Sequence, residues 1–427
     1  MNTPTDAALL RRTAAITLTR IALLGCWFVA IIWAYRQIGA RPDGVVQAGV
    51  LALALAGLKL FSSALSDPLD MDVARQVPVL LADDPDKAVA VWRAAQQIRL
   101  GLGVVIVVLA VLLARPIAAM FLRDPTLGPV VMLAGGGAAL EIQFRGYLSD
   151  CQSRERFGRF LIYEGGLQFL RILGLVVIAV GVGLDASGFL LAYGGATLGM
   201  VAICFGFSGA ARQRLWLFNR RVSIASWSYL RWVAPAMLLS AVVERLDLFM
   251  LTSLRGPADA GLYGALLPLL LVPEMVAGFA THALQPRIAE MHARGVFKAF
   301  WASLVRFTLP VALLTALGVA VFAQDLIGLT IGPAYLAAAP VLRVLAAAVL
   351  LWVGIVPVAL ALVVMTRPRA TLAITLVQAV VVTVAGVLLI PPLGALGAAW
   401  AVLAMRMTAG AMICAAALVA PRSGVAA

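Results

Sequence analysis

Apolar runs of about twenty residues recur along almost the whole chain, and each is long enough to cross a bilayer as a helix. Because 63% of the residues are hydrophobic and 12% are charged, the chain has more apolar surface than a soluble core could bury. The sequence therefore predicts an all-α, polytopic membrane protein with about twelve transmembrane helices. The predicted spans are residues 16–36, 44–65, 98–121, 126–145, 161–184, 188–210, 230–254, 259–285, 301–323, 338–366, 370–391 and 394–418.

The distribution of basic residues predicts the orientation of these spans, because cytoplasmic loops are enriched in Lys and Arg. With the N-terminus inside, most of the 33 basic residues fall in cytoplasmic segments. The chain is therefore expected to lie in the bacterial inner membrane with both termini in the cytoplasm. The net charge of +13 is explained by this pattern, and nucleic acid is not an expected partner. The predicted outer loops contain only Arg36, Arg41, Arg115, Arg123 and Arg255.

Two long polar segments separate the predicted spans on the cytoplasmic side. Ser66–Gln97 is acidic in its early part and is expected to be a solvated loop. The segment of about 211–229 is basic and aromatic, which is typical of an interfacial helix on an anionic leaflet. Since it lies at the midpoint of the chain, it predicts two six-helix lobes, 1–213 and 214–427. A polar break followed by a Gly-Pro pair occurs in both halves, which supports a parallel repeat.

Ionisable residues inside the predicted spans are the main candidates for function. Each would cost about 2.5–3.5 kcal/mol at the centre of an isolated helix, so most are expected to face a watery cavity or one another. Glu164, Gln168 and Arg171 have the spacing of one helical face, and Glu244 and Asp247 share another. The alternative is a set of interhelical ion pairs without a ligand. Separately, Lys59 and Glu164 lie toward the cytoplasmic ends of their spans, close enough to snorkel to the surface. The set comprises Lys59, Glu141, Glu164, Arg171, Glu244, Arg245, Asp247, Glu274 and Arg406.

Signals for an enzyme or a metal site are weak. Asp70-Met71-Asp72 has the spacing of a metal-binding DxD motif, but a solvated acidic face explains it more simply. The four cysteines lie far apart and have neither metal-binding nor disulfide-framework spacing. No nucleotide-binding or hydrolase motif is present. The chain is therefore expected not to be an enzyme and to hold no cofactor.

Several short motifs carry a resemblance to a known family. These motifs are Pro235, Glu244-Arg245-Leu246-Asp247, Gly261-Leu262-Tyr263, Pro286, Gly332-Pro333-Ala334-Tyr335, the Ile390–Ala399 stretch, and Ile38-Gly39 through Gly44. With them the chain resembles the Wzx-type O-antigen and exopolysaccharide flippases of the multidrug/oligosaccharidyl-lipid/polysaccharide (MOP) exporter superfamily. The resemblance covers nearly the whole chain, although its motifs are short and mostly structural.

The resemblance implies a MATE-like fold of two six-helix lobes around a central cavity. It also implies alternating-access translocation of an undecaprenyl-diphosphate-linked oligosaccharide, for lipopolysaccharide or exopolysaccharide synthesis. Membrane lipids, a polysaccharide polymerase and a chain-length regulator are the further partners it implies. Such a cargo requires cations for its diphosphate, and guanidinium groups bind phosphate oxygens in a fork while staying charged. The candidates for this role are Arg171, Arg245, Arg406 and Lys59, and those for coupling H+ or Na+ are Asp247, Glu141, Glu274 and Glu244.

Four other functions remain open from the sequence. A multidrug/cation antiporter of the same superfamily would share the fold, but it tends to carry an acid in the first span, where this chain has Arg20. A lipid II flippase usually has two further helices. A membrane polysaccharide polymerase commonly has a large periplasmic loop, whereas the predicted outer loops here are short. A purely structural membrane partner is the fourth.

Overall fold

The computed structural model describes residues 6–207, 220–271, 313–364 and 368–418, together with positions 273, 306 and 310. Within this part of the chain the regular elements are all helical. Nine of its helices are long and apolar enough to cross a membrane, and the shorter apolar helices Val233–Val243 and Pro257–Leu271 accompany them. The all-α, polytopic prediction is therefore confirmed.

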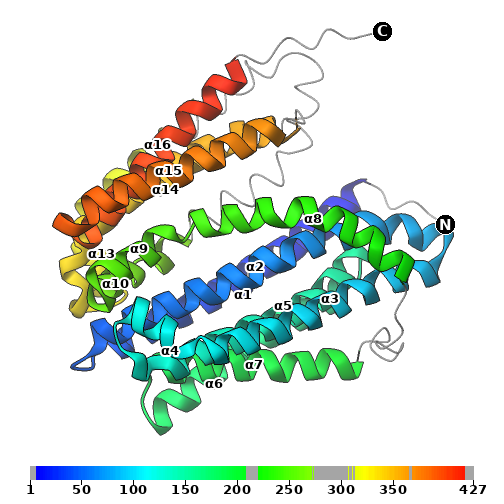
Figure 1. Ribbon diagram of the computed structural model, residues 1–427, viewed down its shortest axis with the longest axis horizontal. Coiled ribbons are helices and arrows are strands. Elements are labelled where there is room, and N and C mark those ends of the chain that lie inside the picture. The colour runs from blue at the N-terminus through cyan, green and yellow to red at the C-terminus, as the bar shows by residue number, and fades with distance from the viewer. Residues whose placement is uncertain are drawn as a thin grey trace. The chain divides into compact units, whose positions relative to one another are not determined.

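The first of two compact units comprises Met1–Ile38 and Ala54–Ala241. Within it α5 packs against α3 and α7, and α6 packs against α7 (Figure 1). Its apolar core is built around buried Trp92, Phe144, Tyr147, Leu167 and Met200. Its helices are α1 (Asp6–Gly39), most of α2 (Gly44–Asp83), α3 (Pro85–Leu112), the short α4 (Ala114–Ile117), α5 (Gly128–Ser153), α6 (Phe157–Gly181), α7 (Ala186–Phe207) and most of α8 (Arg220–Val243).

The segment Ser66–Gln97, predicted to be a loop, is helical, so that prediction was wrong. Helix α2 continues to Asp83, and α3 begins at Pro85 after Asp84, whose carboxylate accepts a hydrogen bond from the backbone N–H of Lys87 at 3.0 Å. Asp84 is thus an N-cap, followed by proline at the first helical position. The apolar face of this stretch, formed by Leu69, Val73 and Val77, is buried and recurs every fourth residue.

The second compact unit comprises Gly39–Leu53 and Val242–Ala427. Helix α16 packs against both α14 and α15 (Figure 1). The first turns of α2 meet α10 at Gly49 and Gly261, where a Cβ on either residue would overlap the backbone of the other helix. Glycine is therefore required for this close approach. The helices are α9 (Leu246–Arg255), α10 (Pro257–Gly264), α13 (Ala323–Leu329), the 3₁₀ turn η3 (Pro333–Ala338), α14 (Ala339–Val364), α15 (Pro368–Leu393) and α16 (Ala395–Leu418).

The predicted seventh span, 230–254, is interrupted. Helix α8 ends at Val243 and α9 begins at Leu246, so Glu244 and Asp247 do not share one continuous helical face as predicted. Glu244 is exposed, whereas Asp247 is buried.

The two compact units divide the chain at Ala241/Val242 and differ in this from the predicted lobes 1–213 and 214–427. Residues 208–219, which make up much of the predicted linker, lie outside the described residues. The two-lobe division therefore stays a prediction.

Candidate functional site

A buried polar cluster lies in the first unit, where α5, α6 and α7 meet. We call Glu141, Arg171, Tyr193 and Thr197 the Arg171 cluster. Arg171 Nη2 donates to Glu141 Oε2 at 2.5 Å and to Thr197 Oγ1 at 3.1 Å. The Tyr193 hydroxyl donates to the same Glu141 oxygen at 3.0 Å. The Arg171 guanidinium also lies 3.7 Å from the centre of the Tyr193 ring and 5.4 Å from that of Trp27 on α1.

The cluster combines charge pairing with an unused donor. Glu141 is 8% exposed and Arg171 is 3% exposed, so each charge depends on the other for compensation. Lys59 on α2 acts electrostatically on Glu141, although Lys59 is itself exposed. Arg171 Nε is buried and has no hydrogen-bond partner in the described part of the chain. The guanidinium therefore keeps a directed N–H group for one more acceptor.

The predicted polar face of α6 is confirmed. Glu164, Gln168 and Arg171 are all buried along it. Glu164 is paired with Arg20 of α1, with Arg20 Nε 3.3 Å from its carboxylate oxygens. The Arg20 guanidinium lies over the ring of Phe160, 5.2 Å from its centre. The expectation that Glu164 snorkels to the surface was therefore wrong, because an arginine on the neighbouring helix compensates its charge within the protein.

A second buried cluster lies in the second unit. We call Asp247, Tyr263, Arg245 and Arg406 the Asp247 cluster. The Tyr263 hydroxyl on α10 donates to Asp247 Oδ2 on α9. Arg245, at the N-cap of α9, and Arg406 of α16 both act electrostatically on Asp247. The Arg406 guanidinium lies 4.3 Å from the centre of the Trp352 ring.

The predicted site residues thus fall into two groups, one in each compact unit. Arg171, Glu141 and Lys59 come together in the first unit, and Arg245, Asp247 and Arg406 in the second. Glu244 faces outward and joins neither cluster, and Glu274 lies outside the described residues.

Sequence reasoning missed the neutral partners of these charges. Tyr193 and Tyr263 each donate to a carboxylate, and Thr197 accepts from Arg171. The available signal was the polar pair Tyr193 and Thr197, four residues apart in an otherwise apolar span. Buried aromatic hydroxyls usually have a hydrogen-bond partner, so such tyrosines are candidates beside any intramembrane charge.

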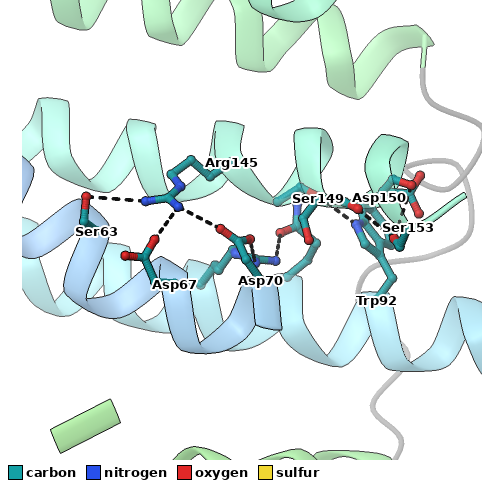
Figure 2. Close-up of polar contacts among 11 residues, drawn as sticks. Ser63, Asp67, Asp70, Trp92, Arg145, Ser149, Asp150 and Ser153 are labelled. Carbon is teal, nitrogen blue, oxygen red and sulfur yellow. Dashed lines mark hydrogen bonds and ion pairs between the residues drawn. The ribbon is translucent and has the colours of Figure 1, made fainter. Parts of the chain in front are cut away.

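A third polar network joins α2, α3 and α5 (Figure 2). Arg99 Nη2 donates to Asp70 Oδ1 at 2.6 Å, and Arg145 pairs with Asp67 and with Asp70 Oδ2, the latter at 3.1 Å. Asp72, the other acid of the DxD motif, pairs with Arg75 at 3.1 Å. Within the described residues no three potential metal ligands come together. Asp67 and Asp70 therefore bind arginines of neighbouring helices, whereas Asp72 pairs within α2.

Comparisons with known proteins identify the fold. No protein-family model matches the chain, and no curated protein matches its sequence. An inward-facing MATE-family multidrug-resistance transporter of the MOP superfamily superposes with a TM-score of 0.77, covering 92% of this chain and 93% of its own at 13% identity. The lipid II flippase MurJ, in an inward closed conformation, gives a TM-score of 0.72 over 94% of this chain and 87% of its own at 11% identity. A MOP-superfamily transporter from Pyrococcus furiosus gives 0.69 over 98% of both chains at 13% identity.

These likenesses cover nearly the full length of each chain. The protein therefore has the fold of MOP-superfamily transporters and is a multi-pass membrane protein. At such low identity the likeness shows the fold alone, and the neighbours include both a multidrug transporter and a lipid flippase.

Proposed function

We propose that this chain is a flippase that moves an undecaprenyl-diphosphate-linked oligosaccharide across the bacterial inner membrane by alternating access. The observation that carries the proposal is the state of Arg171, a buried guanidinium that binds Glu141 and Thr197 through one nitrogen and leaves Nε without a partner in the described residues. A guanidinium remains charged when buried and offers several fixed N–H groups to phosphate oxygens. A diphosphate cargo supplies such oxygens.

The remaining candidates support the same chemistry. Lys59 would add charge near Glu141 in the first unit, and Arg245 and Arg406, which lie near Asp247, are the proposed phosphate contacts of the second unit taken by itself. The carboxylates of Glu141 and Asp247 would bind the coupling H+ or Na+, because each is buried beside a cation and receives a tyrosine hydroxyl. The polymerase and the chain-length regulator remain proposed partners in the same synthesis.

A multidrug/cation antiporter is the main rival, since the fold accommodates both activities. Helix α1 carries no Asp or Glu after Asp6, and Arg20 within it is already paired with Glu164. A cationic drug would also offer no acceptor charge to Arg171 Nε, the N–H group that has no partner in the described residues. The distribution of charge therefore favours an anionic cargo.

The decisive experiment measures translocation by the full-length chain in proteoliposomes. The cargo is a labelled undecaprenyl-diphosphate oligosaccharide, whose arrival in the other leaflet is followed with a membrane-impermeant lectin. Arg171→Lys keeps the charge but loses the planar fork, so we expect the rate to fall about tenfold or more, the equivalent of roughly one strong hydrogen bond. Arg159→Lys, at an exposed arginine on the same helix, is the matched control and should leave the rate unchanged.

Cells provide a second test. Deletion of the gene should make lipid-linked oligosaccharide accumulate on the cytoplasmic leaflet. Normal surface polysaccharide together with lost export of cationic dyes would contradict the proposal and favour the antiporter. Arg171→Ala alone is unsuitable here because it leaves the Glu141 charge buried and unpaired. The double variant Arg171→Gln/Glu141→Gln removes both charges and should lose translocation while retaining normal abundance.

A further inference from the structure

Three buried polar atoms in a row on α6 have no hydrogen-bond partner in the described part of the chain. They are Arg171 Nε, Gln168 Oε1 and Glu164 Oε2, and their residues are 3%, 6% and 6% exposed. The spacing of three and four residues puts them on one face of the helix, over about 10 Å of its length. We call them the α6 row.

Burying these three polar atoms lowers the stability of the folded protein unless another molecule forms hydrogen bonds with them. A buried polar group without a hydrogen bond costs about 1–3 kcal/mol. Glu164 Oε2 lies 3.3 Å from Arg20 Nε, which compensates its charge, but it accepts no hydrogen bond. The described residues also supply no hydrogen bond to Gln168 Oε1. No group of the described residues supplies the missing partners, so this part of the chain leaves room for water or a bound polar molecule.

The order of groups along the row identifies the chemistry that would fit. Arg171 Nε is a donor on a cation, whereas Gln168 Oε1 and Glu164 Oε2 are acceptors. A phosphate oxygen suits the first position, but a second phosphate would be repelled by the Glu164 carboxylate. The acceptors need donors, and sugar hydroxyls or an acetamido N–H are donors without charge. A phosphate followed by a sugar presents its groups in this order.

We propose that Gln168 and Glu164 form a sugar subsite, which binds the hydroxyl or acetamido groups of the sugar next to the diphosphate. This inference rests on the proposed function, because it takes Arg171 as the phosphate contact. Gln168 contributes an amide that can accept and donate, and Glu164 contributes a carboxylate oxygen. Arg20 is a positioning residue, which holds the Glu164 carboxylate from α1. With this subsite, the α6 row would bind the first sugar as well as the phosphate.

The test compares two ligands on the full-length chain in nanodiscs. One is undecaprenyl diphosphate without sugar, and the other is the same lipid bearing the oligosaccharide that accumulates in cells lacking the protein. Gln168→Leu should weaken binding of the sugar-bearing lipid about tenfold, the effect of about one hydrogen bond to a bound ligand, and leave binding of the sugar-free lipid unchanged. Glu164→Gln, which keeps the shape of the side chain, should act in the same direction.

Gln47→Leu is the matched control, because the Gln47 amide donates to Asp43 at 3.0 Å and lies outside the row. It should bind both ligands as the wild type does. In a well-folded Gln168→Leu protein, equal loss of both ligands would show that Gln168 does not recognise the sugar, and no loss of either would show that the row holds water only. Either result would overturn the subsite. A wild-type protein that binds neither lipid would overturn the proposed function itself. Binding of both lipids without discrimination by Gln168 would overturn the subsite alone.

Discussion

The Arg171 cluster and the Asp247 cluster are built on the same contact but compensate their charges differently. In each, a tyrosine hydroxyl donates to a buried carboxylate, from Tyr193 to Glu141 and from Tyr263 to Asp247. In the first, Arg171 pairs directly with that carboxylate. In the second, the described residues give Asp247 no ion pair within 4 Å, and the Arg406 guanidinium lies against the ring of Trp352.

This difference separates two ways of keeping a charge inside a membrane protein. The Glu141 carboxylate is neutralised by a partner that itself requires neutralisation, so removing either charge exposes the other. The Asp247 carboxylate depends on a neutral hydroxyl and on cations acting from a greater distance. Protonation of Glu141 would release Arg171 for another anion, whereas protonation of Asp247 would release no paired arginine. Under the proposed function, exchange between a proton and the anionic cargo would take place at Glu141 and Arg171.

The largest loss of folding stability should come from removing the carboxylate in each cluster. Glu141→Ala leaves Arg171 buried without its counter-ion and should lower the free energy of unfolding by about 3–5 kcal/mol. Asp247→Ala leaves the Tyr263 hydroxyl and the Leu248 backbone N–H without this acceptor but breaks no ion pair among the described residues, and it should cost about 1–3 kcal/mol. Denaturant unfolding in detergent micelles, followed by circular dichroism, measures both. The double variant Glu141→Leu/Arg171→Leu should recover most of the first loss, and equal losses for the two alanine variants would contradict the comparison.

For the two tyrosines, the loss of stability should be larger in the Asp247 cluster than in the Arg171 cluster, the reverse of the order for the carboxylates. Tyr263→Phe removes the only side-chain donor that the described residues give to Asp247, and a hydrogen bond to a charged group contributes about 1.5–3 kcal/mol. Tyr193→Phe leaves Glu141 paired with Arg171 and keeps a ring beneath the guanidinium, so its cost should be about 0.5–1.5 kcal/mol. The same unfolding measurement tests this order. A larger loss for Tyr193→Phe would show that the hydroxyl, more than the arginine, stabilises the Glu141 charge.

Helical periodicity predicted the polar face of α6 that carries Arg171, but it could not predict which residues of other helices bind that arginine. Glu164, Gln168 and Arg171 lie within two turns of one helix, so their common face follows from their spacing. Glu141 and Tyr193, by contrast, are 52 residues apart, and their contact depends on how α5 packs against α7. Spacing within a helix cannot encode that packing.

The errors in the fold have the same origin. Asp67 and Asp70 suggested a solvated loop because the arginines that compensate them, Arg99 and Arg145, come from other helices. The interruption between Val243 and Leu246 lies in a sequence whose composition also suits a continuous helix. In both places local composition was compatible with two structures, and contacts distant in sequence selected one.

The smallest expected loss of stability comes from one hydroxyl of the Arg171 cluster, that of Thr197, and a buried threonine of α9, Thr252, serves for comparison. Thr197 and Thr252 are both fully buried, and each donates to the carbonyl oxygen four residues earlier, at 2.8 Å and 2.6 Å. Only Thr197 also accepts a hydrogen bond from Arg171. Replacing either threonine by valine removes its hydroxyl donor and keeps the side-chain volume similar. At position 197 the replacement also removes an acceptor from the buried Arg171 guanidinium. We therefore expect Thr197→Val to lower the free energy of unfolding by about 1 kcal/mol more than Thr252→Val. In Glu141→Leu/Arg171→Leu this difference should vanish, because the hydroxyl then has no cation to receive. A difference that survives in that background would assign it to the apolar surroundings of Thr197 and not to its bond with Arg171.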